Sequence, residues 1–243
     1  EILAGYDIFK EDKVRRFLGV FPASKWRPLL LHRLYPYLKH SPTRSLSYAQ
    51  AFFGNTAGPY GETFRSHSPR WTMTAMGKSL FSDELRTRLN GNEPWSRLSR
   101  LFSEGTRFPE SDPLTRAQMI EMKTLLPGYI LSSQGDRMAM AHAVEGRFPF
   151  LDHRVVEYCM RIPPRLRMRA LKEKYILRKC MAAYLPREIS EMVKQPYRAP
   201  DAKCFFDSAG RTVADEMMSP AVISSKGYFD PERVHALGAF RSD

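Results

Sequence analysis

Apolar residues recur at a helical spacing in the segment that follows Asp152. Between Asp152 and the proline pair at 163–164, the apolar positions are Val155, Val156, Cys159 and Met160, and the charged positions are Arg154, Glu157 and Arg161. This is the 3.6-residue period of an amphipathic helix that buries one face. Aspartate is a favoured N-cap residue and proline ends helices, so the sequence predicts a helix with these two boundaries.

Two Asp-Pro pairs predict further helix starts. In each pair the aspartate can cap the helix, and the proline takes the first helical position, where no N–H is needed. Asp112-Pro113 leads into the apolar-rich segment 114–126, which we expect Pro127-Gly128 to stop. Asp230-Pro231 repeats the same start near the end of the chain.

Two more apolar stripes lie between prolines. Pro28 opens a segment that Pro36 ends, and its apolar face is formed by Leu29, Leu30 and Leu34. A second stripe precedes Pro186 and consists of Leu177, Cys180, Met181, Tyr184 and Leu185. Both patterns predict helices that turn these side chains inward.

Strand signals are weak throughout. No segment sustains the alternation of a half-buried strand, and 147–150 is too short and contains Pro149. We therefore predict a mainly helical chain, with long irregular connections at 40–72 and 103–112. No repeat or composition shift marks a second domain, so 1–243 is treated as one domain.

The composition is that of a globular protein. Hydrophobic residues make up 43% of the chain, and no run approaches the about 20 apolar residues that span a bilayer. No charged-then-apolar leader opens the sequence. The three cysteines cannot all pair within one chain and match no zinc motif, so we expect free thiols and a cytoplasmic protein.

The charge balance is basic, with 38 Lys and Arg against 26 Asp and Glu and a net charge of +12. Basic residues are dense from 161 to 179, where Glu173 is the single acid. Such a segment is either a solvated helix face or a surface for phosphate-bearing ligands, nucleic acid or anionic membranes. Charge alone does not choose between them.

Charged residues are threaded through an apolar stretch in the second half of the chain. Asp136, Arg137, Glu145, Arg147 and Asp152 interleave with Met138, Met140, Ala141, Val144, Phe148 and Phe150. If they are buried they must pair, because an isolated buried charge costs several kcal/mol. They form either an Arg–carboxylate network that ties helices together or part of a functional site.

Lys194 stands on a segment punctuated by Pro196 and Pro200. A lysine on a stiffened loop can present a point charge to a phosphate, although an ordinary solvated lysine has the same appearance. The sequence has no glycine-rich phosphate loop, HExxH, CxxC or GxSxG motif.

The motifs, taken in order, resemble the C-terminal signature of the glutamine-hydrolysing asparagine synthetase family. The matching segments are Asp136 to His142, Glu145 to His153, Lys174 to Lys179, Leu185-Pro186 and Lys194-Gln195. The opening residues 1–6 resemble the end of the family's G-E-G-A-D-E-x-F-G-G-Y, with Glu1 as its last acid. There are two departures: Gln134 replaces the lysine of Lys-x-Asp-Arg, and Pro196-Tyr197 replaces Gly-Phe after Lys-Gln.

The resemblance implies a fold and an activity. The fold is the helical C-terminal portion of an adenine nucleotide alpha hydrolase-like (pyrophosphate-loop ATPase) α/β synthetase domain. The activity is the ATP- and Mg²⁺-dependent conversion of aspartate to asparagine through β-aspartyl-AMP, with ammonia derived from glutamine. Lys194 is then the cation beside the departing pyrophosphate, Glu1 lies at the edge of the site, and its floor is shaped by Asp136, Arg137, Glu145 and Arg147.

In this family the glutaminase domain, the S-G-G-x-D-S pyrophosphate loop and the first acids of G-E-G-A-D-E precede the point where this sequence starts. We therefore expect a segment that is inactive alone and that has those parts, and in some cases a second copy, as partners. The alternatives are an amidotransferase for another carboxylate, a helical nucleic-acid-binding module, and a structural unit without chemistry. We expect neither a membrane nor, with this motif series, a nucleic acid as partner.

Overall fold

The computed structural model of the chain describes residues 1–37, 45, 47, 52–53, 61–90, 94–103, 107–195 and 208–238. About half of the predicted irregular connection at 40–72 lies outside the described residues, as do Pro196, Tyr197, Pro200 and Cys204. At its described end the prediction is wrong, because η3 (Glu62–Phe64) and the start of α3 (Ser68–Met76) lie there. Across the described part of the chain there is no β-strand, and the only bridges are the isolated pairs Phe81–Phe229 and Arg169–Lys172. The prediction of a mainly helical chain is confirmed.

The chain divides into two compact units, which the composition did not indicate. The first unit comprises Glu1–Pro69 and Phe102–Lys194, and the second comprises Arg70–Leu101 and Gln195–Asp243. Helices α3 (Ser68–Met76) and α5 (Pro94–Ser103) run across two of the points where the chain passes between units, and the third follows Lys194.

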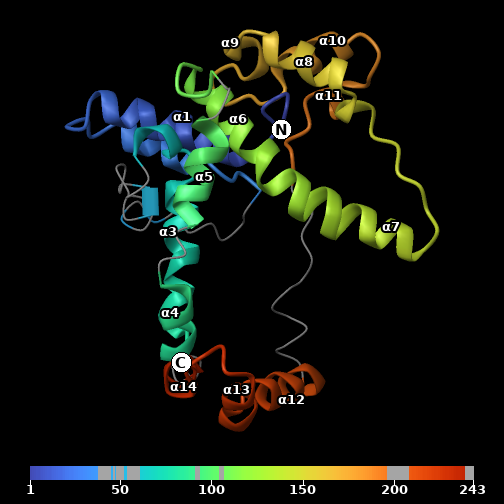
Figure 1. Ribbon diagram of the computed structural model, residues 1–243. Coiled ribbons are helices and arrows are strands. Elements are labelled where there is room, and N and C mark those ends of the chain that lie inside the picture. The colour runs from blue at the N-terminus through green and yellow to red at the C-terminus, as the bar shows by residue number, and fades with distance from the viewer. Residues whose placement is uncertain are drawn as a thin grey trace. The chain divides into compact units, whose positions relative to one another are not determined.

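In the first unit, helix α1 (Asp7–Val20) packs against the 3₁₀ helix η1 (Arg27–Arg33) and helix α6 (Pro113–Lys123) (Figure 1). One core cluster is formed by Ala4, Ile8, Phe9, Ala117 and Met168, and a second by Val14, Leu31, Leu34 and Phe53. The short 3₁₀ helix η3 (Glu62–Phe64) also packs on α6. Burial of these apolar side chains fixes α1 against the other elements.

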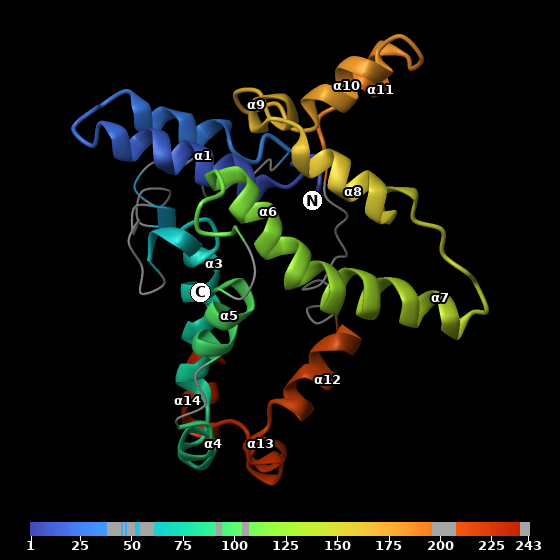
Figure 2. The ribbon, with the colours of Figure 1, turned by 45° about the horizontal axis from the view of Figure 1, so that its top comes forward.

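The rest of the first unit follows α6 along the chain. The π-helix η5 (Leu126–Asp136) and α7 (Arg137–Ala141) continue α6 as a long rod, as Figure 2 shows. Then come η6 (Pro149–Leu151), α8 (His153–Arg161), α9 (Pro164–Arg167), α10 (Tyr175–Met181) and α11 (Arg187–Ser190). Helix α10 packs against both α9 and α11.

The second unit contains η4 (Gly77–Leu80), α4 (Asp83–Leu89), α12 (Ser208–Met217), α13 (Pro220–Lys226) and α14 (Pro231–Gly238). Arg233 of α14 joins the two chain segments of the second unit, because it donates to Phe81 O at 2.8 Å and pairs with Asp83 at 3.0 Å. Among the described residues no helix is both long and apolar enough to cross a bilayer.

The predicted caps are confirmed. Asp152 Oδ1 accepts from Arg154 N at 2.9 Å, Asp112 Oδ1 accepts from Thr115 N at 3.0 Å, and Asp230 Oδ1 accepts from Glu232 N at 2.9 Å. In α8, Cys159 is buried and its apolar neighbours are partly buried, whereas Arg154, Glu157 and Arg161 are exposed, as the helical period predicts.

Three details of the helix predictions are wrong. Pro127-Gly128 does not stop the helix, because α6 ends at Lys123 and Pro127 enters the first turn of η5, where its missing N–H costs nothing. In the 27–33 segment Leu31 is buried and Leu29 exposed, since a 3₁₀ helix aligns Leu31 with Leu34. Cys180, Tyr184 and Leu185 are exposed, because the cluster around Ile2, Leu3 and Cys159 extends to Leu177 and no further along α10.

Candidate functional site

The first six residues are held firmly against the first unit. Ile2 and Leu3 are buried in a cluster with Cys159, and the backbone carbonyl of Glu1 accepts from Ala4 N at 3.0 Å and from the side-chain amide of Gln118. This anchoring places the half-buried Glu1 carboxylate at a defined position. Its Oε1 atom is buried and has no hydrogen-bond partner among the described residues.

Lys194 and Glu1 meet at Tyr6. The Nζ atom of Lys194 lies 4.8 Å from the centre of the Tyr6 ring, within the range of a cation–π contact. Burial, and then the hydrogen bond with the Glu1 carboxylate, raise the pKa of the Tyr6 hydroxyl above its ordinary value. Lys194 is half-buried rather than solvated, and burial is the main cause that lowers the pKa of its amine.

A second lysine reaches the same place from the start of α10. Lys174 has a left-handed backbone, with φ of 53°, and its N–H donates to Leu3 O at 3.1 Å. Its side chain passes directly over Gly5, where a Cβ atom would lie 2.6 Å from Lys174 Cε. The charge of Lys174 also lowers the pKa of Lys194, which is the effect expected of two neighbouring cations.

A chain of ion pairs lies next to the two lysines. Lys10 Nζ lies 3.4 Å from Asp7 Oδ1 and 2.9 Å from Glu173 Oε2, and Arg178 Nη2 lies 2.8 Å from Glu173 Oε1. Asp7, Lys10 and Glu173 are all less than 9% exposed. Buried charges of this kind must be paired, and here the pairing joins α1 to α10.

A buried polar group lies on α6 and the segment before α3. His67 Nε2 is 3.0 Å from Glu121 Oε1, and His67 Nδ1 is 2.8 Å from Ser66 Oγ. The negative charge of Glu121 contributes to the raised pKa of Tyr6. The carboxylates of Glu1 and Glu121 thus both act electrostatically on Tyr6, the residue whose ring Lys194 contacts.

This arrangement suits a polyanionic ligand. The Lys194 ammonium lies over the Tyr6 ring, and the charge of Lys174 is near enough to act on it. On such a half-buried surface a fixed cation interacts with an anion more strongly than it does in bulk water. Burial is the main cause that lowers the pKa of Lys194, and bound phosphate would offset the smaller contribution from repulsion by Lys174. Among the described residues no group of three or more His, Cys, Asp or Glu side chains could hold a metal ion.

The other four predicted site residues lie elsewhere in the first unit. Asp136 and Arg137 are exposed at the junction of η5 and α7, on the rod that runs away from the N-terminus (Figures 1 and 2). Glu145 and Arg147 are exposed and pair with each other at 2.7 Å. The structure does not bring these four side chains to Tyr6, so their role as the floor of the site stays a prediction. They also form no buried network between helices.

Tyr6, Lys174 and the ion pairs are site residues that the sequence did not predict. Lys174 stands in the motif 174–179, which supplied a signal, but spacing along the chain did not connect it with Gly5 or Lys194. Arg178 stands in the same motif, within the basic segment 161–179, for which the sequence predicts either a solvated helix face or a surface for anionic partners.

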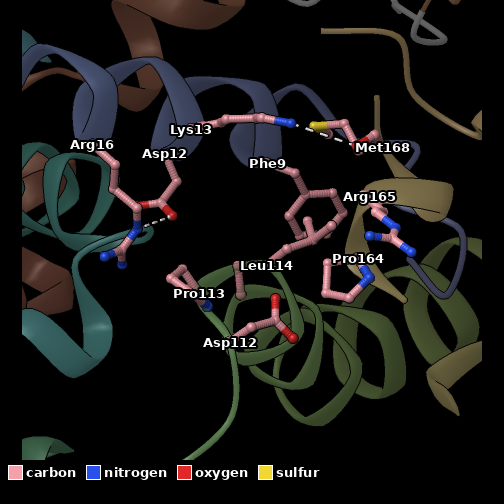
Figure 3. Close-up of a pocket in the computed structure, with 11 residues that line it drawn as sticks. Phe9, Asp12, Lys13, Arg16, Asp112, Pro113, Leu114, Pro164, Arg165 and Met168 are labelled. Atoms are coloured by element: carbon pink, nitrogen blue, oxygen red, sulfur yellow. Dashed lines mark hydrogen bonds and ion pairs between the residues drawn. The ribbon is translucent and has the colours of Figure 1, made fainter. Parts of the chain in front are cut away.

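A separate cavity of about 340 Å³ lies between α1, α6 and α9 (Figure 3). Its walls are mostly apolar, and several of its charged groups have partners: Arg16 pairs with Asp12 at 2.7 Å, and Lys13 Nζ lies 3.5 Å from Met168 O. Residues three and four apart share a face of a helix. The cavity is lined by the α1 face that carries Phe9, Asp12, Lys13 and Arg16, whereas Asp7 and Lys10 lie on a different face. It is a less suitable place for phosphate than the surface around Tyr6.

The chain matches the family model described as "Asparagine synthase" over residues 1–240. It is 31% identical over 218 residues to "Amidase chyE" of Penicillium rubens, which covers 82% of this chain and 31% of that relative. It is 27% identical over 251 residues to "Amidase chry2" of Gibberella zeae, which covers 95% of this chain and 35% of that relative. It is also 45% identical over 67 residues to "Asparagine synthetase [glutamine-hydrolyzing] 3" of Bacillus subtilis, a match that covers 28% of this chain and 11% of that relative.

The chain spans about a third of the length of the two amidases. No solved structure matches it.

Proposed function

The chain belongs to the asparagine synthase family, and on that premise we propose that it forms part of an ATP-dependent amidotransferase. In this proposal the surface around Tyr6 binds the phosphates of ATP, and Lys194 stabilises the departing pyrophosphate. The observation that carries the proposal is the position of Lys194, half-buried against Tyr6 and beside the segment that contains Glu1.

The proposed reaction requires fixed cations beside the departing pyrophosphate. When an acceptor carboxylate attacks the α-phosphorus of ATP, the bond between that phosphorus and the bridging oxygen breaks, and negative charge grows on the pyrophosphate. Preorganised cations that face the growing charge lower the barrier, because they need no reorganisation as it develops. Lys194 and Lys174 are two such cations, and the ion pairs of Glu173 with Lys10 and Arg178 support their positions.

The unpartnered Glu1 oxygen fits a role at a metal. Hard divalent cations take carboxylate oxygen ligands, and Mg²⁺ is usually held by one or two carboxylates together with substrate phosphates. Glu1 Oε1, which is buried without a partner among the described residues, is the oxygen we assign to Mg²⁺. When bound there, Mg²⁺ supplies further neutralisation of phosphate charge.

Our first candidate for the acceptor is aspartate, which is converted to asparagine through β-aspartyl-AMP with ammonia derived from glutamine. Because the chain spans about a third of the amidases it matches, we assign the pyrophosphate loop and the glutaminase to other parts of the enzyme. The isolated chain should then release no pyrophosphate from ATP, aspartate and ammonia. We also propose a cytoplasmic enzyme that has a second copy of itself as a partner and binds neither a membrane nor a nucleic acid.

A second candidate is a carboxylate other than aspartate. Two of the relatives matched over most of this chain are named amidases, and Pro196-Tyr197 stands where the family pattern has Gly-Phe. Proline fixes φ and has no N–H, so the sequence after Lys194 lacks a donor and a backbone freedom that glycine supplies.

The test uses the whole enzyme that contains this chain. Pyrophosphate release is measured with ATP, ammonia and either aspartate or a panel of other carboxylic acids, and glutamine hydrolysis is measured separately. Lys194→Ala should lower the rate of pyrophosphate release about 10²–10³-fold, the range for loss of one preorganised donor. Glutamine hydrolysis should remain.

Lys179→Ala is the matched control, because Lys179 is an exposed lysine of α10. It should leave both activities unchanged. Synthesis that persists in the Lys194→Ala enzyme would remove the role of Lys194. Turnover of another acid in preference to aspartate would select the second candidate.

A further inference from the structure

Arg178 makes more directed contacts than any other side chain near Lys194. Its Nη2 atom donates to Glu173 Oε1 at 2.8 Å, and its Nε atom donates to the Glu173 carbonyl at 3.1 Å. Its Nη1 atom donates to the carbonyls of Ser190 and Met192, at 3.0 and 2.9 Å. One guanidinium therefore joins the start of α10 to the segment that ends at Lys194.

The segment that carries Lys194 has little apolar packing of its own. Ile189, Met192 and Val193 are 53%, 59% and 50% exposed. Its backbone hydrogen bonds that the structure describes are local, such as Ile189 N to Pro186 O and Met192 N to Ile189 O. Local bonds fix the shape of a turn but not its position on the protein. The two carbonyls that Arg178 holds supply that position.

The other end of Arg178 is anchored in buried structure. The Arg178 side chain is 15% exposed, and the Glu173 side chain with which it pairs is 7% exposed. Glu173 also pairs with Lys10 of α1, at 2.9 Å. The path from α1 through Glu173 and Arg178 reaches the Met192 carbonyl, two residues before Lys194.

We propose that Arg178 is the positioning residue that holds the Lys194 segment, and thereby the Lys194 ammonium, against Tyr6. Its effect on catalysis rests on the function proposed above, whereas its effect on the position of Lys194 does not. The planar fork of guanidinium allows one side chain to serve a carboxylate and two carbonyls at once. A lysine at this position keeps the charge but cannot make these contacts together.

The first experiment uses the chain itself. Trypsin cleavage of the bond between Lys194 and Gln195 and acetylation of the Lys194 amine by acetic anhydride are followed by mass spectrometry, in the unchanged chain, Arg178→Lys and Arg178→Gln. Release of the segment should speed cleavage at Lys194 by about tenfold or more, because proteolysis follows local opening. The pH profile of Lys194 acetylation should move toward that of a free lysine.

Arg187→Lys is the matched control. Arg187 lies close by in sequence and pairs with Glu191 at 2.8 Å, but its side chain is 85% exposed. This variant should leave both readouts unchanged. Circular dichroism and the urea midpoint show whether each variant folds, and Arg178→Lys provides the test if Arg178→Gln does not fold. Unchanged cleavage and unchanged acetylation in a folded Arg178→Lys chain overturn the proposal.

The second experiment uses the whole enzyme. Arg178→Lys should lower kcat for pyrophosphate release at least about tenfold, with little change in KM for the acceptor, because positioning acts on the transition state. The two proposals fail separately. Full synthesis by Lys194→Ala refutes the proposed function, and the labelling of Lys194 in Arg178→Lys still decides the role of Arg178.

Discussion

The side chain of Lys174 crosses the backbone of Gly5 so closely that a Cβ atom at position 5 would lie 2.6 Å from Lys174 Cε. Glycine at position 5 therefore leaves room for the Lys174 side chain and does not serve an unusual φ, because the positive-φ glycines that the structure describes are Gly61 and Gly227. The contact brings the Lys174 amine to the segment that carries Glu1 and Tyr6. A residue without a side chain thus decides where a cation lies.

Gly5→Ala should displace Lys174 without unfolding the chain. The atom that must move is near the end of a flexible side chain, so we expect a loss of stability of about 1 kcal/mol, the lower end of the range for overpacking. In the whole enzyme, pyrophosphate release should fall while the urea midpoint changes little. Gly128→Ala is the control, because no heavy atom lies within 4 Å of a Cβ there. Equal activity of the two variants would contradict the importance of this contact.

Glu173 should make the stability of the chain depend on pH. Burial by itself raises the pKa of this carboxyl, but the hydrogen bond from Lys10 and the charges of Lys10 and Arg178 outweigh it, so the pKa falls below the ordinary 4.5. A carboxyl with a lowered folded-state pKa stabilises the fold above its unfolded value and loses that contribution as the pH falls through the folded value.

The unchanged chain should therefore be more stable than Glu173→Gln at pH 7. This difference in the free energy of unfolding should narrow as the pH falls below about 4.5. Urea unfolding at a series of pH values measures it. Glu157→Gln, which alters an exposed carboxylate, should change stability little at each pH. A gap between the unchanged chain and Glu173→Gln that is constant from neutral to acid pH would argue against this account.

Asp112 should stabilise the fold mainly as a helix cap. Its Oδ1 accepts from Thr115 N at 3.0 Å, and its carboxylate lies 3.8 Å from Arg167, whose side chain is buried. Asp112→Ala should lower the free energy of unfolding by about 1 kcal/mol, the typical value for a lost N-cap. Asp112→Asn should retain most of that stabilisation, because asparagine caps a helix equally well. Urea midpoints compare the two. Equal destabilisation by both would show that the charge facing Arg167 matters more than the cap.

The two cysteines that the structure describes should differ in reactivity. Cys180 is a free, exposed thiol, whereas Cys159 is a free, buried one whose pKa is raised by burial. In a Cys204→Ser background, an aromatic disulfide reagent should label Cys180 in the folded chain and Cys159 only after urea is added. Adding Cys180→Ser should remove the fast reaction. Rapid labelling of Cys159 in the folded chain would mean that the cluster around it opens readily.

Local contacts account for the part of the fold that the sequence predicted well. The caps at Asp112, Asp152 and Asp230 act on backbone groups two or three residues away, so the signal and its partner lie in the same short segment. The inward face of α8 follows from the helical period for the same reason. The prediction for Cys180 and Tyr184 failed because an apolar stripe is buried only where another element covers it, and periodicity does not report that.

By itself, the sequence determined the helical class, the helix starts, the family motifs and the candidacy of Lys194 and Glu1. Only the tertiary structure decided that Tyr6, Lys174 and Lys194 lie together, that Arg178 holds the backbone before Lys194, and that Asp136, Arg137, Glu145 and Arg147 lie on the surface away from them. The physical reason is distance along the chain. Residues far apart in sequence meet only after α1, α6 and α10 have packed, and their charges acquire shifted pKa values and partners from that packing alone.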